Sequence, residues 1–164
     1  MNKKQNYFRK KILNYIVSNF AKDKNYYLLV GDMGFGSIDK LKKECPSQVI
    51  NCGIMEQGMI GIAAGMAMSG LKPIVYSIVN FLAYRVLEQI RNDIVFQDLD
   101  VKFIGTGANN YFSFLGYSHC CGQDDILLMR LINVKVFDPY NSKKTFPKLV
   151  QEWIRYNKTA YIRV

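Results

Sequence analysis

The chain has 164 residues, of which 49% are hydrophobic and 21% charged. This size and composition fit one globular domain with a substantial core, and we predict a single domain over residues 1–164. No segment approaches about 18 uninterrupted apolar residues, so no transmembrane helix is expected. The basic N-terminus is not followed by the apolar run of a signal peptide. We therefore expect a cytoplasmic protein that does not bind membranes.

Charge and cysteine content restrict the classes of function. The formal net charge is +9, but the lysines and arginines are spread along the chain and no nucleic-acid motif accompanies them. Solvated basic faces are favoured, and nucleic-acid binding is a distant alternative whose affinity would fall steeply with salt.

The four cysteines, Cys45, Cys52, Cys120 and Cys121, show no CxxC spacing. They indicate reduced thiols, and we predict no metal ligands in this chain.

Helical and strand patterns alternate along the chain. Apolar residues at helical spacing begin the series at residues 7–21, with Ser37, Asp124 and Ser142 as expected helix caps and Gly70 as a helix stop. The alternation predicts an α/β fold in which helices flank both faces of a parallel sheet. Helices are expected at 7–21, 37–44, 56–69, 80–95, 124–131 and 142–156, and strands at 26–30, 48–51, 72–78, 100–106, 134–137 and 159–164.

Three loops leave the carboxyl ends of these predicted strands, where open α/β sheets bind ligands. They cover residues 52–55, 77–81 and 107–123. The third is long for a compact domain, and such loops are often functional.

The most specific of these segments is Asn51–Met59, NCGIMEQGM. Glu56 follows a glycine turn and opens an apolar helix, whose N-terminus favours the anionic carboxylate. Taken alone, Glu56 could equally be a first-turn glutamate that complements the helix dipole, or half of a capping box. Small residues recur on successive turns of this helix and permit a close helix–helix contact or a subunit interface, although plain core packing is also open. These small residues are Gly58, Gly61, Ala64 and Gly65.

The other two loops carry an aromatic pair and a histidine. Phe81 and Tyr84 lie one helical turn apart just past a strand end, where they could stack on a flat ligand ring or pack in the core. His119, in the segment GYSHCCGQDD, is the only histidine. In a glycine-flanked loop it could transfer protons at neutral pH, although the isolated signal is weak.

Together, in this order, these segments resemble the pyrimidine-binding domain of the transketolase superfamily, which includes transketolase, deoxyxylulose phosphate synthase and the beta subunits of 2-oxoacid dehydrogenases. The segment NCGIMEQ resembles the family's N-x-G-I-x-E signature, Tyr84–Asp93 resembles the helix that follows, and Gly116–Asp125 with RLIN at 130–133 resembles the G-P-T-H loop and the L-R-x-I-P-N segment. The resemblance covers nearly the whole chain.

The resemblance implies a thiamine diphosphate enzyme. The carboxyl matching Glu56 would hydrogen-bond N1′ of the aminopyrimidine and promote deprotonation of the thiazolium C2, with a general acid–base effect of roughly 10²–10⁴ in rate. Phe81, and with it Tyr84, would stack on the pyrimidine, beside Ile54 of the motif. His119 matches a family histidine near the reacting carbon. The expected reaction is transfer of a two-carbon ketol unit.

The resemblance also implies a partner. The diphosphate-binding domain of transketolase, with its G-D-G … N magnesium motif, has no counterpart here, so a second subunit is expected to supply the Mg²⁺ and diphosphate ligands. Two copies of each chain would form a heterotetramer. Gly107 and Asp138 stand where transketolase grips a sugar phosphate, and Tyr117 and Ser118 replace proline and threonine of the histidine loop. A substrate other than a simple pentose phosphate is therefore an open alternative.

Two other functions keep the same fold. The chain could serve a 2-oxoacid decarboxylase or dehydrogenase or a deoxyxylulose-type synthase, so that the small-molecule substrate would be a 2-oxoacid in place of a ketose. It could also be a non-catalytic regulatory subunit, against which the presence of both Glu56 and His119 counts.

Overall fold

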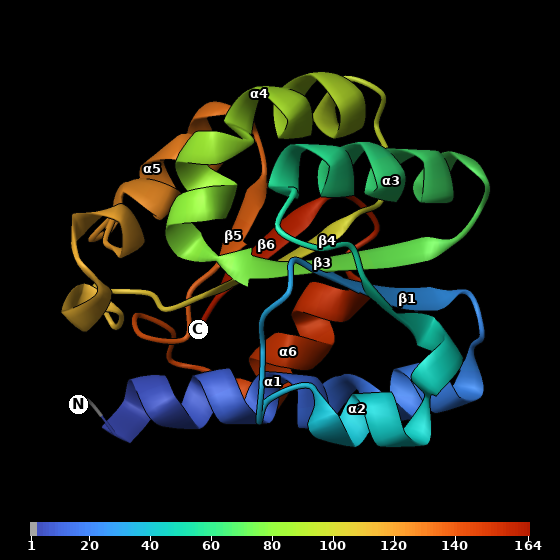
Figure 1. Cartoon of the computed structure of the whole chain (residues 1–164), viewed down its shortest axis with the longest axis horizontal. Coiled ribbons are helices and arrows are strands. Elements are labelled where there is room, and N and C mark those ends of the chain that lie inside the picture. The colour runs from blue at the N-terminus through green and yellow to red at the C-terminus, as the bar shows by residue number, and fades with distance from the viewer. Residues whose placement is uncertain (1–2) are drawn as a thin grey trace.

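The computed structural model describes residues 3–164, and Met1 and Asn2 lie outside the described residues. Its centre is a six-stranded, fully parallel sheet with strand order β2-β1-β3-β4-β6-β5 (Figure 1). The strands are β1 (Tyr26–Val30), β2 (Val49–Asn51), β3 (Lys72–Ile78), β4 (Lys102–Thr106), β5 (Lys135–Phe137) and β6 (Ala160–Arg163). The predicted parallel α/β sheet is confirmed.

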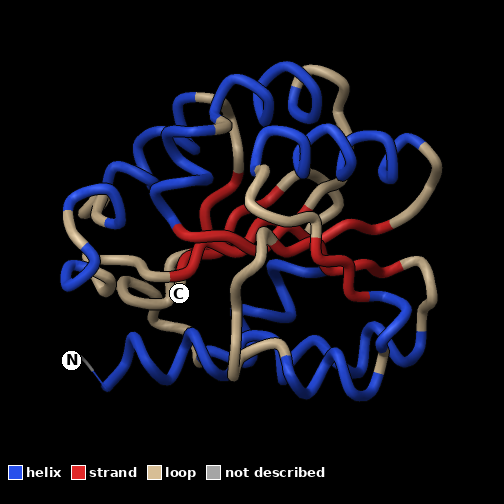
Figure 2. Tube along the Cα trace, viewed as in Figure 1, coloured by secondary structure: helices blue, strands red, loops and turns tan. Residues whose placement is uncertain are grey.

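Helices cover both faces of this sheet, as predicted (Figure 2). One layer holds α1 (Lys3–Lys22), α2 (Asp39–Glu44) and α6 (Phe146–Arg155); the other holds α3 (Glu56–Met68), α5 (Asp124–Leu131) and the helical segment around α4 (Leu87–Gln89). None of the helices within residues 3–164 is long and apolar enough to span a membrane.

Apolar side chains fill the space between the sheet and each helical layer. Ile12, Phe20 and Trp153 are buried on the α1 and α6 side, and Met59 and Ile90 on the other. A smaller apolar cluster lies under the loops that follow β3 and β4, and it contains Ile78, Val79, Ala108 and Cys121. Because this cluster ties both loops to the sheet, it fixes the edge at which the predicted ligand loops meet.

The three predicted side-chain caps are wrong. The Ser37 hydroxyl makes no hydrogen bond within residues 3–164, and α2 begins after Ile38 without a side-chain cap. Asp124 is the first residue of α5, so its carboxylate lies inside the helix boundary. The last helix begins only at Phe146, because a proline suits the first turn of a helix and Pro147 occupies it. Gly70 does end its helix, with the positive φ of 82° that favours glycine.

The segment predicted as one helix over residues 80–95 departs from α geometry. Phe81–Arg85 and Ile90–Val95 are π-helical turns on either side of the short α4. A π turn accommodates one extra residue, and such turns are frequent at functional sites. Phe81 and Arg85, four positions apart, lie against each other on this segment.

A buried ion pair joins the elements at the carboxyl edge of the sheet. Arg163 of β6 and Asp125 of α5 are both fully buried and form two hydrogen bonds, from Nε to Oδ2 at 2.8 Å and from Nη2 to Oδ1 at 3.0 Å. Tyr161 donates to the same carboxylate at 2.6 Å. Burial, with this carboxylate beside it, raises the pKa of Tyr161 well above 10.0 and keeps the phenol protonated. The Arg163 guanidinium also donates to Asn109 and to the Gly122 carbonyl, so it holds both ends of the 107–123 loop.

We predict that Asp125→Ala lowers the free energy of unfolding by about 3–5 kcal/mol, because it leaves the buried Arg163 charge without its partner. Urea unfolding followed by fluorescence of Trp153, the single tryptophan, measures the change. Asp98→Asn is the matched control: asparagine tolerates the positive φ of 51° at this position, and the ion pair with Lys158 is exposed on both sides, so its loss should change stability little. Equal, small losses in the two variants would contradict the prediction.

Candidate active site

The turn that carries Glu56 is built by Asn51. The Asn51 side-chain oxygen accepts the backbone N–H groups of Asp32 at 2.9 Å and of Gly53 at 3.0 Å, and its amide donates to the Asp32 carboxylate. Gly53 has a φ of 74°, a conformation that costs little only for glycine. A methyl group on Gly31 would lie 3.3 Å from the Gly53 carbonyl oxygen, so the ends of β1 and β2 are in close contact.

This turn delivers Glu56 to the first position of α3. Its side chain is only 4% exposed, and Oε2 accepts a 2.7 Å hydrogen bond from Nη1 of Arg85. The helix N-terminus adds a favourable field for the anionic carboxylate. Both interactions stabilise a charge that burial alone would disfavour.

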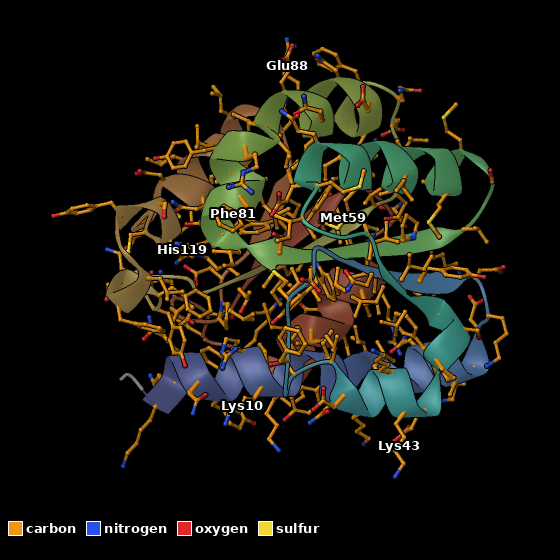
Figure 3. All side chains as sticks on the ribbon, in the orientation of Figure 1. Lys10, Lys43, Met59, Phe81, Glu88 and His119 are labelled. Atoms are coloured by element: carbon orange, nitrogen blue, oxygen red, sulfur yellow. The ribbon has the colours of Figure 1, made fainter. Side chains whose placement is uncertain are left out.

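Phe81 and His119 extend the site along the same edge. The Arg85 guanidinium lies 3.9 Å from the Phe81 ring centre, and the His119 ring meets Phe81 edge-on with centres 5.3 Å apart. Figure 3 shows Phe81 and His119 next to each other, in the half of the molecule opposite the helices that carry Lys10 and Lys43. One continuous line of contacts, which we call the site line, therefore joins four side chains: Glu56, Arg85, Phe81 and His119.

Hydrogen bonds hold His119 in this place. The Asn80 amide donates to the Ser118 carbonyl at 2.8 Å, and the Ser118 hydroxyl lies 2.9 Å from Nδ1 of His119. The other side-chain atom of Asn80, Oδ1, is buried and has no hydrogen-bond donor within residues 3–164.

The other two predicted site residues, Tyr84 and Ile54, are exposed and lie beside the site line. Tyr84 is 55% exposed, and its hydroxyl donates to Asp124 of α5, which raises the pKa of Tyr84 to about 12 and keeps it a donor. The π turn separates Tyr84 from Phe81, which pairs with Arg85. Ile54 is 77% exposed and lines a cavity of about 320 Å³ together with Glu56 and Arg85.

Three residues of this edge were missed by sequence reasoning. Arg85 could have been noticed as a cation inside an aromatic segment, but its partner Glu56 lies 29 positions away. Arg163 and Asn80 carry no local signal, because their roles depend on loops that meet only in the folded chain. Within residues 3–164, no group of three or more His, Cys, Asp or Glu side chains is arranged to hold a metal ion.

The two positions that match the sugar-phosphate grip have structural roles. Gly107 has a φ of 88°, and a methyl group there would lie 2.3 Å from the Phe112 ring, so a larger residue does not fit. The Asp138 carboxylate accepts from the Tyr140 backbone and the Asn141 side chain and lies 3.7 Å from Arg163. Neither position presents a cation to an anionic substrate.

The site offers a buried carboxylate beside a surface cavity, with an aromatic face and an imidazole in line with it. These groups fit a flat, polar heterocycle that exchanges protons with a carboxylate. Residues 7–164 match the family described as "Transketolase, pyrimidine binding domain". The chain therefore belongs to the transketolase pyrimidine-binding domain family.

Relatives and solved structures agree with this membership. Over 157 residues the chain is 30% identical to an apulose-4-phosphate transketolase subunit of Phocaeicola vulgatus, a match that covers 95% of this chain and 50% of that protein. It is 43% identical over 127 residues, 77% of this chain and 19% of the relative, to a 1-deoxy-D-xylulose-5-phosphate synthase of Synechococcus sp.. A solved structure described as "Split gene transketolase, inactive beta4 tetramer" matches 95% of this chain and 50% of its own with a TM-score of 0.80 and 28% identity. The chain thus spans about half the length of its Phocaeicola relative.

We predict that Asn51→Ala destabilises the chain by about 1 kcal/mol, because two backbone donors and the Asp32 carboxylate exchange a fixed partner for water. Thermal unfolding followed by circular dichroism measures this change. Asn92→Ala is the control, since the Asn92 side chain accepts only from the adjacent, exposed Arg91 within residues 3–164. A melting temperature that is the same in both variants would show that Asn51 does not hold the turn.

Proposed function

We propose that residues 1–164 act as one pyrimidine-binding domain of a two-component, thiamine diphosphate-dependent transketolase-like enzyme. The reaction is transfer of a two-carbon ketol unit. One observation carries the proposal: the buried Glu56 carboxylate opens α3, borders a surface cavity and lies in line with an aromatic ring and a histidine.

Each site residue has a proposed role. Glu56 hydrogen-bonds N1′ of the aminopyrimidine and exchanges a proton there, Phe81 stacks on the ring, and Ile54 packs beside it. Tyr84 is a second aromatic contact, steadied by its bond to Asp124. His119 holds or moves a proton at the substrate. When bound, thiamine diphosphate supplies the electron sink that such carbon–carbon chemistry requires.

The fit to the aminopyrimidine is supported by the donors and acceptors of the site. A ring nitrogen needs a hydrogen-bonding carboxylate, and Glu56 provides one at the border of a surface cavity. Mg²⁺ and the diphosphate need cationic or oxygen-rich ligands, and no metal-ligand cluster is found within residues 3–164. We assign those ligands to a partner chain with a diphosphate-binding domain.

The outer face of α3 supports a subunit interface. Gly61 and Gly65 face open space, and Ile62 and Met68 are exposed beside them, 41% and 66% respectively. This face of α3 is apolar, and its glycines leave it nearly flat. Such a surface suits close contact with another helix. The Phocaeicola relative is itself named as one subunit of a transketolase, which fits a two-component assembly. We propose two copies of each chain in a heterotetramer.

The substrate proposed first is a ketose. The apulose phosphate in the relative's name supports a sugar donor or acceptor, while Gly107 and Asp138 argue against a pentose-phosphate grip of the usual kind. The second candidate is a deoxyxylulose-type synthase, or a 2-oxoacid decarboxylase or dehydrogenase. The 43% identity to a deoxyxylulose phosphate synthase favours it.

We predict that Glu56→Gln lowers ketol transfer by roughly 10²–10⁴ in kcat, because the amide cannot exchange a proton with N1′. The assay uses the two subunits with Mg²⁺ and thiamine diphosphate. Glu88→Gln is the control, since Glu88 lies on α4, is exposed and points away from the sheet (Figure 3). Normal turnover by Glu56→Gln would end the proposal.

We predict negligible turnover by the chain alone and turnover with its diphosphate-binding partner, because the cofactor lies across both subunits. Hydroxypyruvate, pyruvate and a ketose phosphate should be offered in parallel to the assembled enzyme. Turnover of hydroxypyruvate or the ketose phosphate supports ketol transfer. Turnover of pyruvate alone would replace it with the second candidate.

A further inference from the structure

Arg85 contacts the two groups that the proposed function reserves for the pyrimidine. Its guanidinium donates to Glu56 Oε2 at 2.7 Å and lies 3.9 Å from the centre of the Phe81 ring. Phe81 and Arg85 lie four positions apart on one helical turn, a spacing that puts the two side chains on the same face. One planar cation thus covers both the carboxylate and the aromatic ring.

The chemistry of this cation resembles that of the proposed ligand. A guanidinium is flat, carries N–H donors in its plane and stacks on aromatic faces. A protonated aminopyrimidine is also flat, donates N–H groups in its plane and stacks. Oε2 of Glu56 and the face of the Phe81 ring cannot fully bind the Arg85 guanidinium and the aminopyrimidine at the same time. A pyrimidine ring that binds both groups therefore displaces Arg85.

We propose that Arg85 is a gating residue that competes with the cofactor's pyrimidine for Glu56 and Phe81. This inference rests on the proposed function. Before the ring enters, Arg85 compensates the buried Glu56 charge, which would be costly without a partner. Its side chain is 43% exposed, so it can leave toward solvent, while its backbone carbonyl stays within 3.5 Å of the Gln57 side chain.

The competition lowers the apparent affinity for the cofactor. When the site is open in only a fraction of molecules, the apparent dissociation constant equals that of the open site divided by this fraction. An Arg85 that is engaged in about nine of ten molecules therefore weakens binding about tenfold. Arg85→Gln should remove this competition and tighten binding by about the same factor.

The test is a calorimetric titration of the assembled two-subunit enzyme with thiamine diphosphate at fixed Mg²⁺. Wild type, Arg85→Gln and Arg91→Gln are compared. Arg91 is the matched control, because its guanidinium also covers an aromatic ring, that of Phe96 at 4.2 Å, and its hydrogen bond goes to the adjacent Asn92, away from the site line. Loss of a cation alone should weaken binding of the anionic cofactor, so tighter binding by Arg85→Gln cannot come from charge.

Binding about tenfold tighter in Arg85→Gln, with Arg91→Gln equal to wild type, supports the gate. Equal or weaker binding by Arg85→Gln overturns the gate and leaves the proposed function standing. If folded, assembled wild type binds no thiamine diphosphate, the proposed function fails and the gate fails with it.

Discussion

The site depends on one constraint: a carboxylate almost completely removed from water needs partners that compensate its lost hydration. Glu56 meets it with a helix N-terminus and the Arg85 cation, 2.7 Å away. Asn51 and Gly53 shape the turn that puts this side chain at the sheet edge. The same cation then reaches Phe81, and Phe81 reaches His119, so the whole site line is organised around the charge of Glu56.

The two faces of the sheet are built for different surroundings. The α1 and α2 layer is lysine-rich outside, with Lys10 and Lys43 directed outward (Figure 3), which suits contact with water. The α3 and α5 layer exposes Ile62, Met68 and Leu131. The two helical layers therefore differ in what they expose: one is lysine-rich and the other apolar. Both layers also cover the sheet within this one chain, so about half the length of the Phocaeicola relative is enough to form a self-contained sheet.

Much of the fold could be predicted from local pattern. Strand β1 and strand β3 are found at the predicted residues, and the glutamate that opens α3 is where the motif placed it. The sequence pattern failed where contacts between distant residues or a local departure from α geometry determine the structure. Ser142 is predicted to cap a helix that in the structure starts later, at Phe146 with Pro147 in its first turn, and the π turns over residues 81–85 and 90–95 leave no mark in the apolar spacing. The Asp125–Arg163 pair joins residues 38 positions apart, so no local window could show it.

The most direct test of the account is the ¹⁵N chemical shift of N1′ in labelled thiamine diphosphate bound to the assembled subunits. A carboxylate that shares a proton with N1′ moves this resonance away from that of the free cofactor. We predict such a shift in the wild-type complex and its loss in Glu56→Gln with the cofactor still bound. The same N1′ resonance in both complexes would show that Glu56 does not contact the ring.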